Sequence, residues 1–185
     1  MLLRPEVPED GEMHPRSSSQ RRTPGHAAFV AAGMFGVIHA GFSLFWAVGG
    51  TWLLWSLGSG LLQTFEGREW ILFPVGVVKL VAAVTPLALF LRGWPAHRLT
   101  RAACWVGASV LILWGGLNTV VGNLVLSGLI QPSAGYDRPG MIGHAWMWDP
   151  LFLGWGVALV IGLLASGRRD RAVPQPGQLQ SVRDL

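Results

Sequence analysis

The chain has 185 residues, of which 51% are hydrophobic and only 13% are charged. Soluble domains carry about 25% charged residues, so this composition argues against a soluble globular protein. The net charge of +4 comes from arginines beside apolar blocks, which membrane topology explains, so nucleic acid is not expected as a partner. The single cysteine excludes an intrachain disulfide.

The N-terminal half contains a tail and two predicted spans. Residues 1–26 are rich in Pro, Ser, Glu and Arg and are predicted to be a disordered cytoplasmic tail. The first span is predicted at about 27–48, because this apolar length at about 1.5 Å per residue matches a hydrocarbon core of about 30 Å. Residues 51–70 form a connection of mixed character, in which the apolar residues 52–55 are too short to span and are predicted to lie in the membrane interface. A second span follows at about 71–91.

The C-terminal half contains two further spans, predicted at about 102–129 and 146–166. The start of the fourth span is ambiguous. Asp149 followed by Pro150 has the form of an N-cap and a proline at the first helical position, so the helix begins there or some residues earlier. The arginine-rich stretch after Gly167 is predicted to end it, and residues 168–185 to form a second disordered tail.

The fold class is therefore predicted to be all-α: a four-helix transmembrane bundle over 27–167, with the lipid bilayer as its first partner. Arginines in the short segments predict its orientation, because they collect on the cytoplasmic side. One side carries only Arg68 and Arg138. The other carries three groups: Arg16, Arg21 and Arg22; Arg92, Arg98 and Arg101; and Arg168, Arg169 and Arg171. We expect a multi-pass protein of the cell membrane with both termini in the cytoplasm.

Polar side chains at membrane depth are the candidates for function, because a charge at the bilayer centre costs a few kcal/mol or more. Lys79 is the only lysine and lies about eight residues, roughly 12 Å, from the outer end of the second span. His39 shares this depth in the first span. Ser43 and Trp46 follow His39 on the same helical face. A histidine that bonds a backbone carbonyl is an equally good interpretation of His39, whereas a functional role is favoured for Lys79.

The third and fourth spans supply further candidates. Asn118 and Asn123 lie toward the outer end of the third span, where Asn118 is more simply an interhelical contact. Gly115 and Gly122 beside them would let another backbone approach closely.

At the outer start of the fourth span, Asp149 is the expected carboxylate partner of Lys79, with Glu66 and Glu69 as competitors. Asp149 is also most simply an N-cap, and His144 an interfacial loop residue. The sequence thus predicts an outward-facing polar pocket formed by His39, Ser43, Trp46, Lys79, Asn118, Asn123, His144 and Asp149.

No motif names a catalytic residue, a metal site or a cofactor. The zinc-binding HExxH pattern, the nucleophile elbow, the phosphate loop and the CxxCH haem attachment pattern are all missing. A haem between His39 and His144 would require the fourth span to begin well before Asp149. The tryptophans near the ends of apolar blocks are predicted to be interfacial anchors, whereas Trp114 and Trp155 lie deeper. The predicted anchors are Trp46, Trp52, Trp55, Trp70, Trp94, Trp105, Trp146 and Trp148.

Two stretches carry a resemblance: residues 38–50, IHAGFSLFWAVGG, and residues 148–156, WDPLFLGWG. They resemble a group of small four-helix membrane proteins of actinobacteria that is known as a domain of unknown function. In that group a histidine followed by tryptophan and Gly-Gly ends the first span, and a Trp-Asp-Pro motif opens the last. The likeness covers about 30–167. It implies the four-span topology, singles out His39, Trp46, Asp149 and Pro150, and implies no reaction.

Three functions remain open. A small-amphiphile-binding or accessory membrane protein is favoured, because one compact bundle without catalytic motifs fits it best. An isomerase-like intramembrane enzyme is the second, with His39 or Asp149 in acid–base work and Lys79 as electrostatic stabiliser. An oligomeric proton-coupled transporter is the third, and the lack of polar residues in the inner half counts against it. A homo-oligomer or a protein partner is compatible with each.

Overall fold

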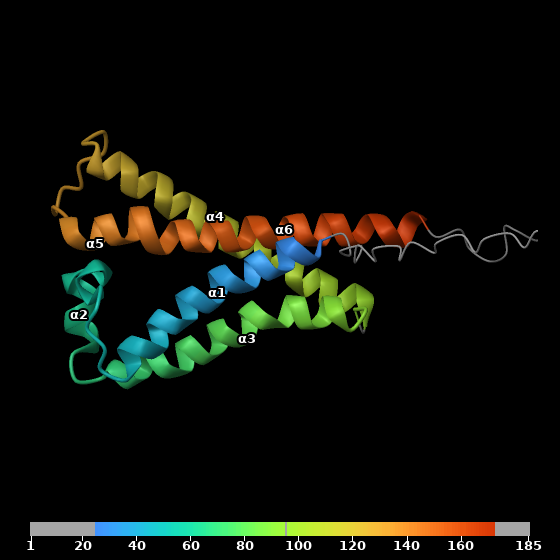
Figure 1. The fold of residues 1–185 in the computed structure, drawn as a ribbon. Coiled ribbons are helices and arrows are strands. Elements are labelled where there is room, and N and C mark those ends of the chain that lie inside the picture. The colour runs from blue at the N-terminus through green and yellow to red at the C-terminus, as the bar shows by residue number, and fades with distance from the viewer. Residues whose placement is uncertain (1–24, 95, 173–185) are drawn as a thin grey trace, which may run out of the picture.

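The computed structural model describes residues 25–94 and 96–172, without the side chains of 168–172. Of the two predicted disordered tails, residues 1–24 and 173–185 lie outside the described part. The described chain is helical (Figure 1). Its elements are α1 (His26–Ala47), η1 (Leu54–Leu57), α2 (Ser59–Phe65), η2 (Glu69–Ile71), α3 (Leu72–Leu91), α4 (His97–Leu126), α5 (Arg138–Gly143), η3 (His144–Trp148) and α6 (Asp149–Ala172).

Four helical segments are long and apolar enough to cross a membrane, which confirms the predicted all-α fold with four spans. They are His26–Ala47, Glu69–Leu91, His97–Leu126 and Arg138–Gly167. Helices α1 and α3 begin and end within one residue of the predicted bounds. Helix α4 begins earlier than predicted, at His97, because its polar first turn continues the helix beyond the apolar block.

The fourth span differs most from the prediction. Helical structure runs on from Arg138 through α5, η3 and α6 to Ala172. Asp149 therefore lies inside a helix, and the prediction that it is an N-cap is wrong. Element η3 is a π-helical turn in which the Asp149 N–H donates to the His144 carbonyl. This wide turn directly precedes Pro150, which has no N–H to donate.

The prediction that the arginine-rich stretch ends the helix is also wrong. Helix α6 continues through Gly167 to Ala172, rather than stopping at the arginine-rich stretch. A glycine inside a helix costs only about 1 kcal/mol relative to alanine, and arginine is a good helix former. The composition of this stretch therefore ends the apolar block without ending the helix.

The spans are arranged as two pairs. The main interfaces join α1 to α3, α4 to α6, and α1 to α6, so the lateral order is α3, α1, α6, α4. Helices α3 and α4 follow each other in the chain but do not pack along their lengths. The two pairs diverge toward the end that carries α2 and α5, and α2 lies between them there (Figure 1). We call this end the α2 end of the bundle.

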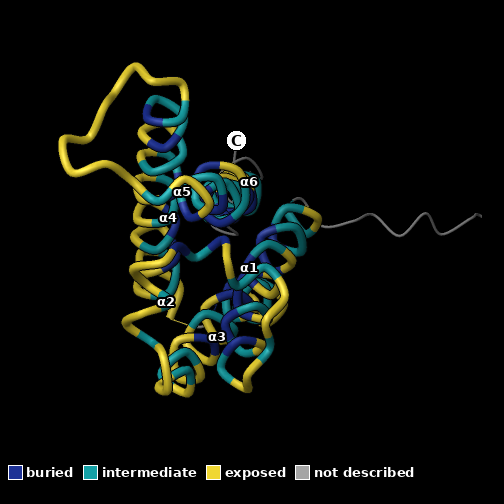
Figure 2. Tube along the Cα trace, turned by 90° about the vertical axis from the view of Figure 1, so that its left-hand side faces the viewer, coloured by how far each residue is buried: buried dark blue, intermediate teal, exposed yellow. Residues whose placement is uncertain are grey.

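Burial follows this arrangement. Buried positions line the contacts among the spans, whereas much of α3 and α4 is exposed (Figure 2). The exposed side chains there are large and apolar, for example Val78 at 68% and Leu113 at 71% exposure. An apolar surface of this extent, on helices of spanning length, suits contact with lipid.

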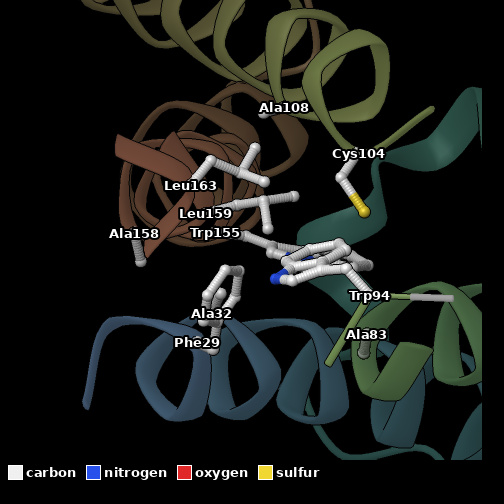
Figure 3. Close-up of a cluster of buried hydrophobic side chains, with 10 residues drawn as sticks. All are labelled: Phe29, Ala32, Ala83, Trp94, Cys104, Ala108, Trp155, Ala158, Leu159 and Leu163. Carbon is white, nitrogen blue, oxygen red and sulfur yellow. The ribbon is translucent and has the colours of Figure 1, made fainter. Parts of the chain in front are cut away.

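The half of the bundle away from the α2 end has an apolar core. Figure 3 shows it as Phe29, Ala32, Ala83, Trp94, Cys104, Ala108, Trp155, Ala158, Leu159 and Leu163. Arg101 borders this core: its guanidinium donates to Ser166 Oγ at 2.9 Å and to the Leu163 carbonyl at 2.6 Å, and lies 5.1 Å from the Trp94 ring. These bonds tie the start of α4 to the later part of α6.

Glycines set the close contact between α4 and α6. A Cβ at Gly115 would lie 2.5 Å from the Leu153 nitrogen, and one at Gly122 would lie 2.8 Å from Ala145 Cβ. No side chain fits at such distances. The predicted close approach of another backbone at these two glycines is therefore confirmed.

Candidate functional site

One cavity of about 180 Å³ at the α2 end gathers most of the predicted site residues. All four spans contribute to its lining. The predicted residues that line it are His39, Ser43, Trp46, Lys79, His144 and Asp149. The lining residues that were not predicted to belong to the pocket are Leu57, Leu61, Phe65, Leu72, Trp114, Trp148 and Phe152.

The Lys79 side chain of α3 is held by α1. Its Nζ lies 3.3 Å from His39 Nδ1 and donates to Ser43 Oγ at 3.1 Å. A protonated Lys79 has only donors, so in that state His39 Nδ1 accepts and the ring proton is on Nε2. Ser43 Oγ in turn lies 3.4 Å from the His39 carbonyl. The i, i+4 spacing of His39 and Ser43 is what places both acceptors on one face of α1.

Lys79 has no carboxylate partner. The predicted ion pair with Asp149, or with Glu66 or Glu69, is wrong, because within the described residues no carboxylate lies within 4.0 Å of Nζ. The Phe152 ring centroid is 5.6 Å from Nζ, which adds a cation–π contact. Two of the three ammonium donors thus have protein acceptors, and the third is left for the cavity.

His39 is buried, with 5% of its surface exposed, and packs among aromatic rings. Its ring centroid lies 4.0 Å from that of Phe152 and 5.8 Å from that of Trp148. Its Nε2 is buried and has no hydrogen-bond partner. Leaving a buried donor unpaired costs about 1–3 kcal/mol.

Asp149 is bound instead by His144. The distance from His144 Nδ1 to Asp149 Oδ2 is 3.2 Å, and only 3% of the Asp149 side chain is exposed. In a regular α-helix, residues five apart point about 140° away from each other. The π-helical turn between them brings both side chains to one side. His144 is therefore a helical residue of the cavity wall and not an interfacial loop residue.

The segment between α1 and α3, residues 51–71, forms a roof over the cavity. Ser56 is fully buried in it, accepting a hydrogen bond from Trp148 Nε1 at 3.0 Å and donating to the Leu53 carbonyl at 2.5 Å. A Cβ at Gly143 would lie 2.0 Å from the Ser56 carbonyl oxygen, so the glycine is needed for the roof to dock on α5. This part of the segment packs on protein, whereas Trp52 and Trp55, in the stretch predicted for the interface, are 67% and 49% exposed.

Three tryptophans predicted to be interfacial anchors are buried in the bundle. Trp46, Trp94 and Trp148 are 4%, 7% and 3% exposed. Trp46 Nε1 donates to the Trp52 carbonyl at 3.0 Å, and Trp148 Nε1 donates to Ser56 as described. Bonds of this kind allow an indole to be buried. The other predicted anchors keep exposed rings: Trp52, Trp55, Trp70, Trp105 and Trp146.

Asn118 and Asn123 do not belong to the cavity. The Asn118 amide donates to the Trp114 carbonyl at 3.0 Å, and the Asn123 amide donates to the Thr119 carbonyl at 2.7 Å. Both bonds stay within α4, so neither residue joins two helices. Phe152, which the sequence reading missed, follows Asp149 by three residues, and this helical spacing was the available indication of its place in the wall.

A haem does not fit this site, although the fourth span does begin well before Asp149. The cavity is smaller than the roughly 300 Å³ of a small drug-sized pocket. Over the described residues, no group of three or more His, Cys, Asp or Glu side chains is placed to hold a metal ion.

Comparison with known proteins places the chain in a family. Residues 36–159 match DUF3995, described as a protein of unknown function, and the chain belongs to this family. This confirms the expected membership of a family of unknown function. The matched range contains every residue that lines the cavity. No curated protein and no solved structure matches the chain.

Proposed function

We propose that this member of the DUF3995 family is a multi-pass protein of the cell membrane that binds a small amphiphile by its polar head. The observation that carries the proposal is the Lys79 ammonium, which faces the cavity without a carboxylate within 4.0 Å. A cation at membrane depth opposes folding unless it is paired. A ligand that supplies the missing acceptor explains why the chain keeps a lysine there.

The site offers such a head group one charged donor, the third N–H of Lys79. The rings of Phe152 and Trp114 give the cavity apolar walls. A volume of about 180 Å³ suits a head group and excludes a whole lipid. The amphiphile therefore binds with its head inside and the rest of the molecule outside.

The proposal includes an orientation, with both termini in the cytoplasm and the α2 end outside. Arg92, Arg98 and Arg101 cluster around the connection between α3 and α4, whereas Arg68 and Arg138 alone flank the spans at the α2 end. Arginine-rich short segments stay on the cytoplasmic side. The head-group site then opens in the outer half of the membrane.

An isomerase-like intramembrane enzyme is the second candidate. The observation that favours it is the His144–Asp149 pair, which lines the same cavity as His39 and Lys79. A bound head group would then lie beside a carboxylate, an imidazole and a cation, the groups that acid–base catalysis needs. An enzyme would convert the bound amphiphile and lose this turnover in Asp149→Asn while still binding it.

Mass spectrometry of protein purified gently from its native membrane tests the binding function. The comparison is between the wild type, Lys79→Met, and Val78→Met as a matched control, because Val78 is the exposed neighbour of Lys79. Loss of a charged hydrogen bond of about 1.5–3 kcal/mol corresponds to at least a tenfold weaker affinity. We expect an amphiphile in the wild type and in Val78→Met, and little in Lys79→Met. A folded wild type with no bound amphiphile would contradict the proposal.

A further inference from the structure

We infer that the amphiphile is an acidic lipid whose hydrocarbon chain lies in a groove between α3 and α4. This inference rests on the proposed function and names the class of its ligand. The groove has a volume of about 660 Å³ and an almost wholly apolar lining. Its walls come from α3, α4 and α6, including Ala82, Leu89, Gly107, Leu111 and Trp155.

The linings of the groove and of the head-group cavity are adjacent along the helices. On each of three helices, a residue of the cavity and a residue of the groove are three positions, or about one turn, apart. These pairs are Lys79 and Ala82 on α3, Trp114 and Leu111 on α4, and Phe152 and Trp155 on α6. The rings of Phe152 and Trp155 are stacked, with centroids 6.4 Å apart and planes at 14°. A molecule held at Lys79 can therefore continue into the groove along one aromatic floor.

The groove is open toward the bilayer. Helices α3 and α4 do not pack along their lengths, so nothing in the described fold separates the groove from lipid on that side. Trp114, at the junction of the cavity and the groove, is 62% exposed. An acyl chain can thus reach the site sideways from the membrane without displacing the roof. The groove follows α3 from Ala82 to Leu89, and a lipid held at Lys79 would follow this helix for about 15 Å as far as Leu89.

The charge of the cavity selects an acidic head. Asp149 is already bound by His144, whereas Lys79 has no anion. A carboxylate or a phosphate can accept from the free N–H of the Lys79 ammonium, and charge-assisted bonds of this kind are the strong ones. A free fatty acid and a lysophospholipid with a terminal phosphate share this chemistry. Both carry one chain for the one groove.

Binding to the full-length protein in neutral phosphatidylcholine nanodiscs, measured by native mass spectrometry, tests the inference. The probes are palmitate, octanoate, lysophosphatidate and hexadecanol. The variant is Gly107→Leu, because a Cβ at Gly107 meets no atom within 4 Å and its side chain would fill the groove. The control is Gly41→Leu on α1. A Cβ at Gly41 also meets no atom within 4 Å, and Gly41 does not line the groove.

We expect Gly107→Leu to weaken palmitate or lysophosphatidate binding by about tenfold or more and to leave octanoate binding unchanged. Gly41→Leu should change neither, and hexadecanol should bind far more weakly than the acidic probes. The tighter of the two acidic long-chain probes identifies the head group.

Equal binding of hexadecanol and the acidic probes would overturn the assignment of an acidic head group. If palmitate and lysophosphatidate bound Gly107→Leu as tightly as the wild type, the assignment of the chain to the groove would be overturned. If Lys79→Met abolished their binding in that case, the proposed head-group function would stand. No binding of any probe to the folded wild type would overturn both.

Discussion

Holding an ammonium at Lys79 opposes folding, because its hydrogen bonds to His39 and Ser43 replace water without supplying a countercharge. We predict that Lys79→Met leaves the free energy of unfolding unchanged or raises it by about 1 kcal/mol. Methionine keeps the apolar stem and removes the charge. Thermal or detergent unfolding of the ligand-free protein measures the difference. A loss of about 2 kcal/mol or more would show that Lys79 is mainly structural, bracing α3 against α1.

Asp137, at the connection before α5, gives the molecule a pH-dependent contact outside the spans. Its carboxylate accepts the backbone N–H of Ser59, and this hydrogen bond lowers the pKa of the carboxyl below its ordinary value. A lowered pKa in the folded state stabilises the contact at pH above the ordinary aspartate pKa, and the stabilisation is lost as the pH falls through the lowered value.

We therefore predict that acidification loosens the start of α2, and that Asp137→Asn loosens it at every pH. Hydrogen exchange of the α2 amides, corrected for the intrinsic pH dependence, measures this. Protection that stays constant in the wild type down to pH values below the aspartate range would contradict the role of Asp137.

Some contacts of the candidate site could be predicted from the sequence, and others could not. The shared depth of His39 and Lys79 follows from counting residues along each span, and the structure brings their side chains together. The partner of Lys79 was predicted wrongly as Asp149. That choice depends on which helices are neighbours and on the π-helical turn, which moves the Asp149 side chain to His144. Neither can be read from residue spacing in a single span.

At the scale of elements, the buried hydrogen bond from Trp148 to Ser56 is one of the contacts that hold the roof on the bundle. We predict that Trp148→Phe lowers the free energy of unfolding by about 1–3 kcal/mol, because Ser56 loses its donor in a buried site. The roof should then be cut faster between 51 and 71 in limited proteolysis. Trp146→Phe is the matched control, since Trp146 is 68% exposed and should change stability by no more than about 0.5 kcal/mol. Equal effects of the two variants would count against the docking of the roof.

The elements themselves were predictable where the hydrophobic pattern is regular. The bounds of α1 and α3 coincide with their apolar blocks. The start of the fourth span was not predictable, because Asp149-Pro150 has the composition of a helix start. The π-helical turn before it has no simple composition of its own that would indicate it. The contact of the roof with α5 was equally hidden, since Gly143 has no side chain to indicate a partner.

At the scale of the whole molecule, the number of spans was predictable and their lateral order was not. The four spans have nearly uniform apolar surfaces, so no stripe on α3 or α4 tells which neighbour each takes. The order α3, α1, α6, α4 separates two helices that are consecutive in the chain. This separation creates the groove between α3 and α4, and it makes the proposed ligand site open sideways to lipid.

Orientation is the remaining property of the whole molecule, and it decides which side of the membrane supplies the ligand. We predict that both termini are cytoplasmic, because arginines flank the spans mainly at the end away from α2. Single cysteines introduced into a Cys104→Ala background test this with a membrane-impermeant maleimide on intact cells. Gln63→Cys, an exposed position in α2, should react directly. Ser18→Cys should react only after the cells are permeabilised. The opposite labelling pattern would place the α2 end, and with it the cavity, on the cytoplasmic side. The acidic lipid would then come from the inner leaflet, and the proposed head-group site itself would be unaffected.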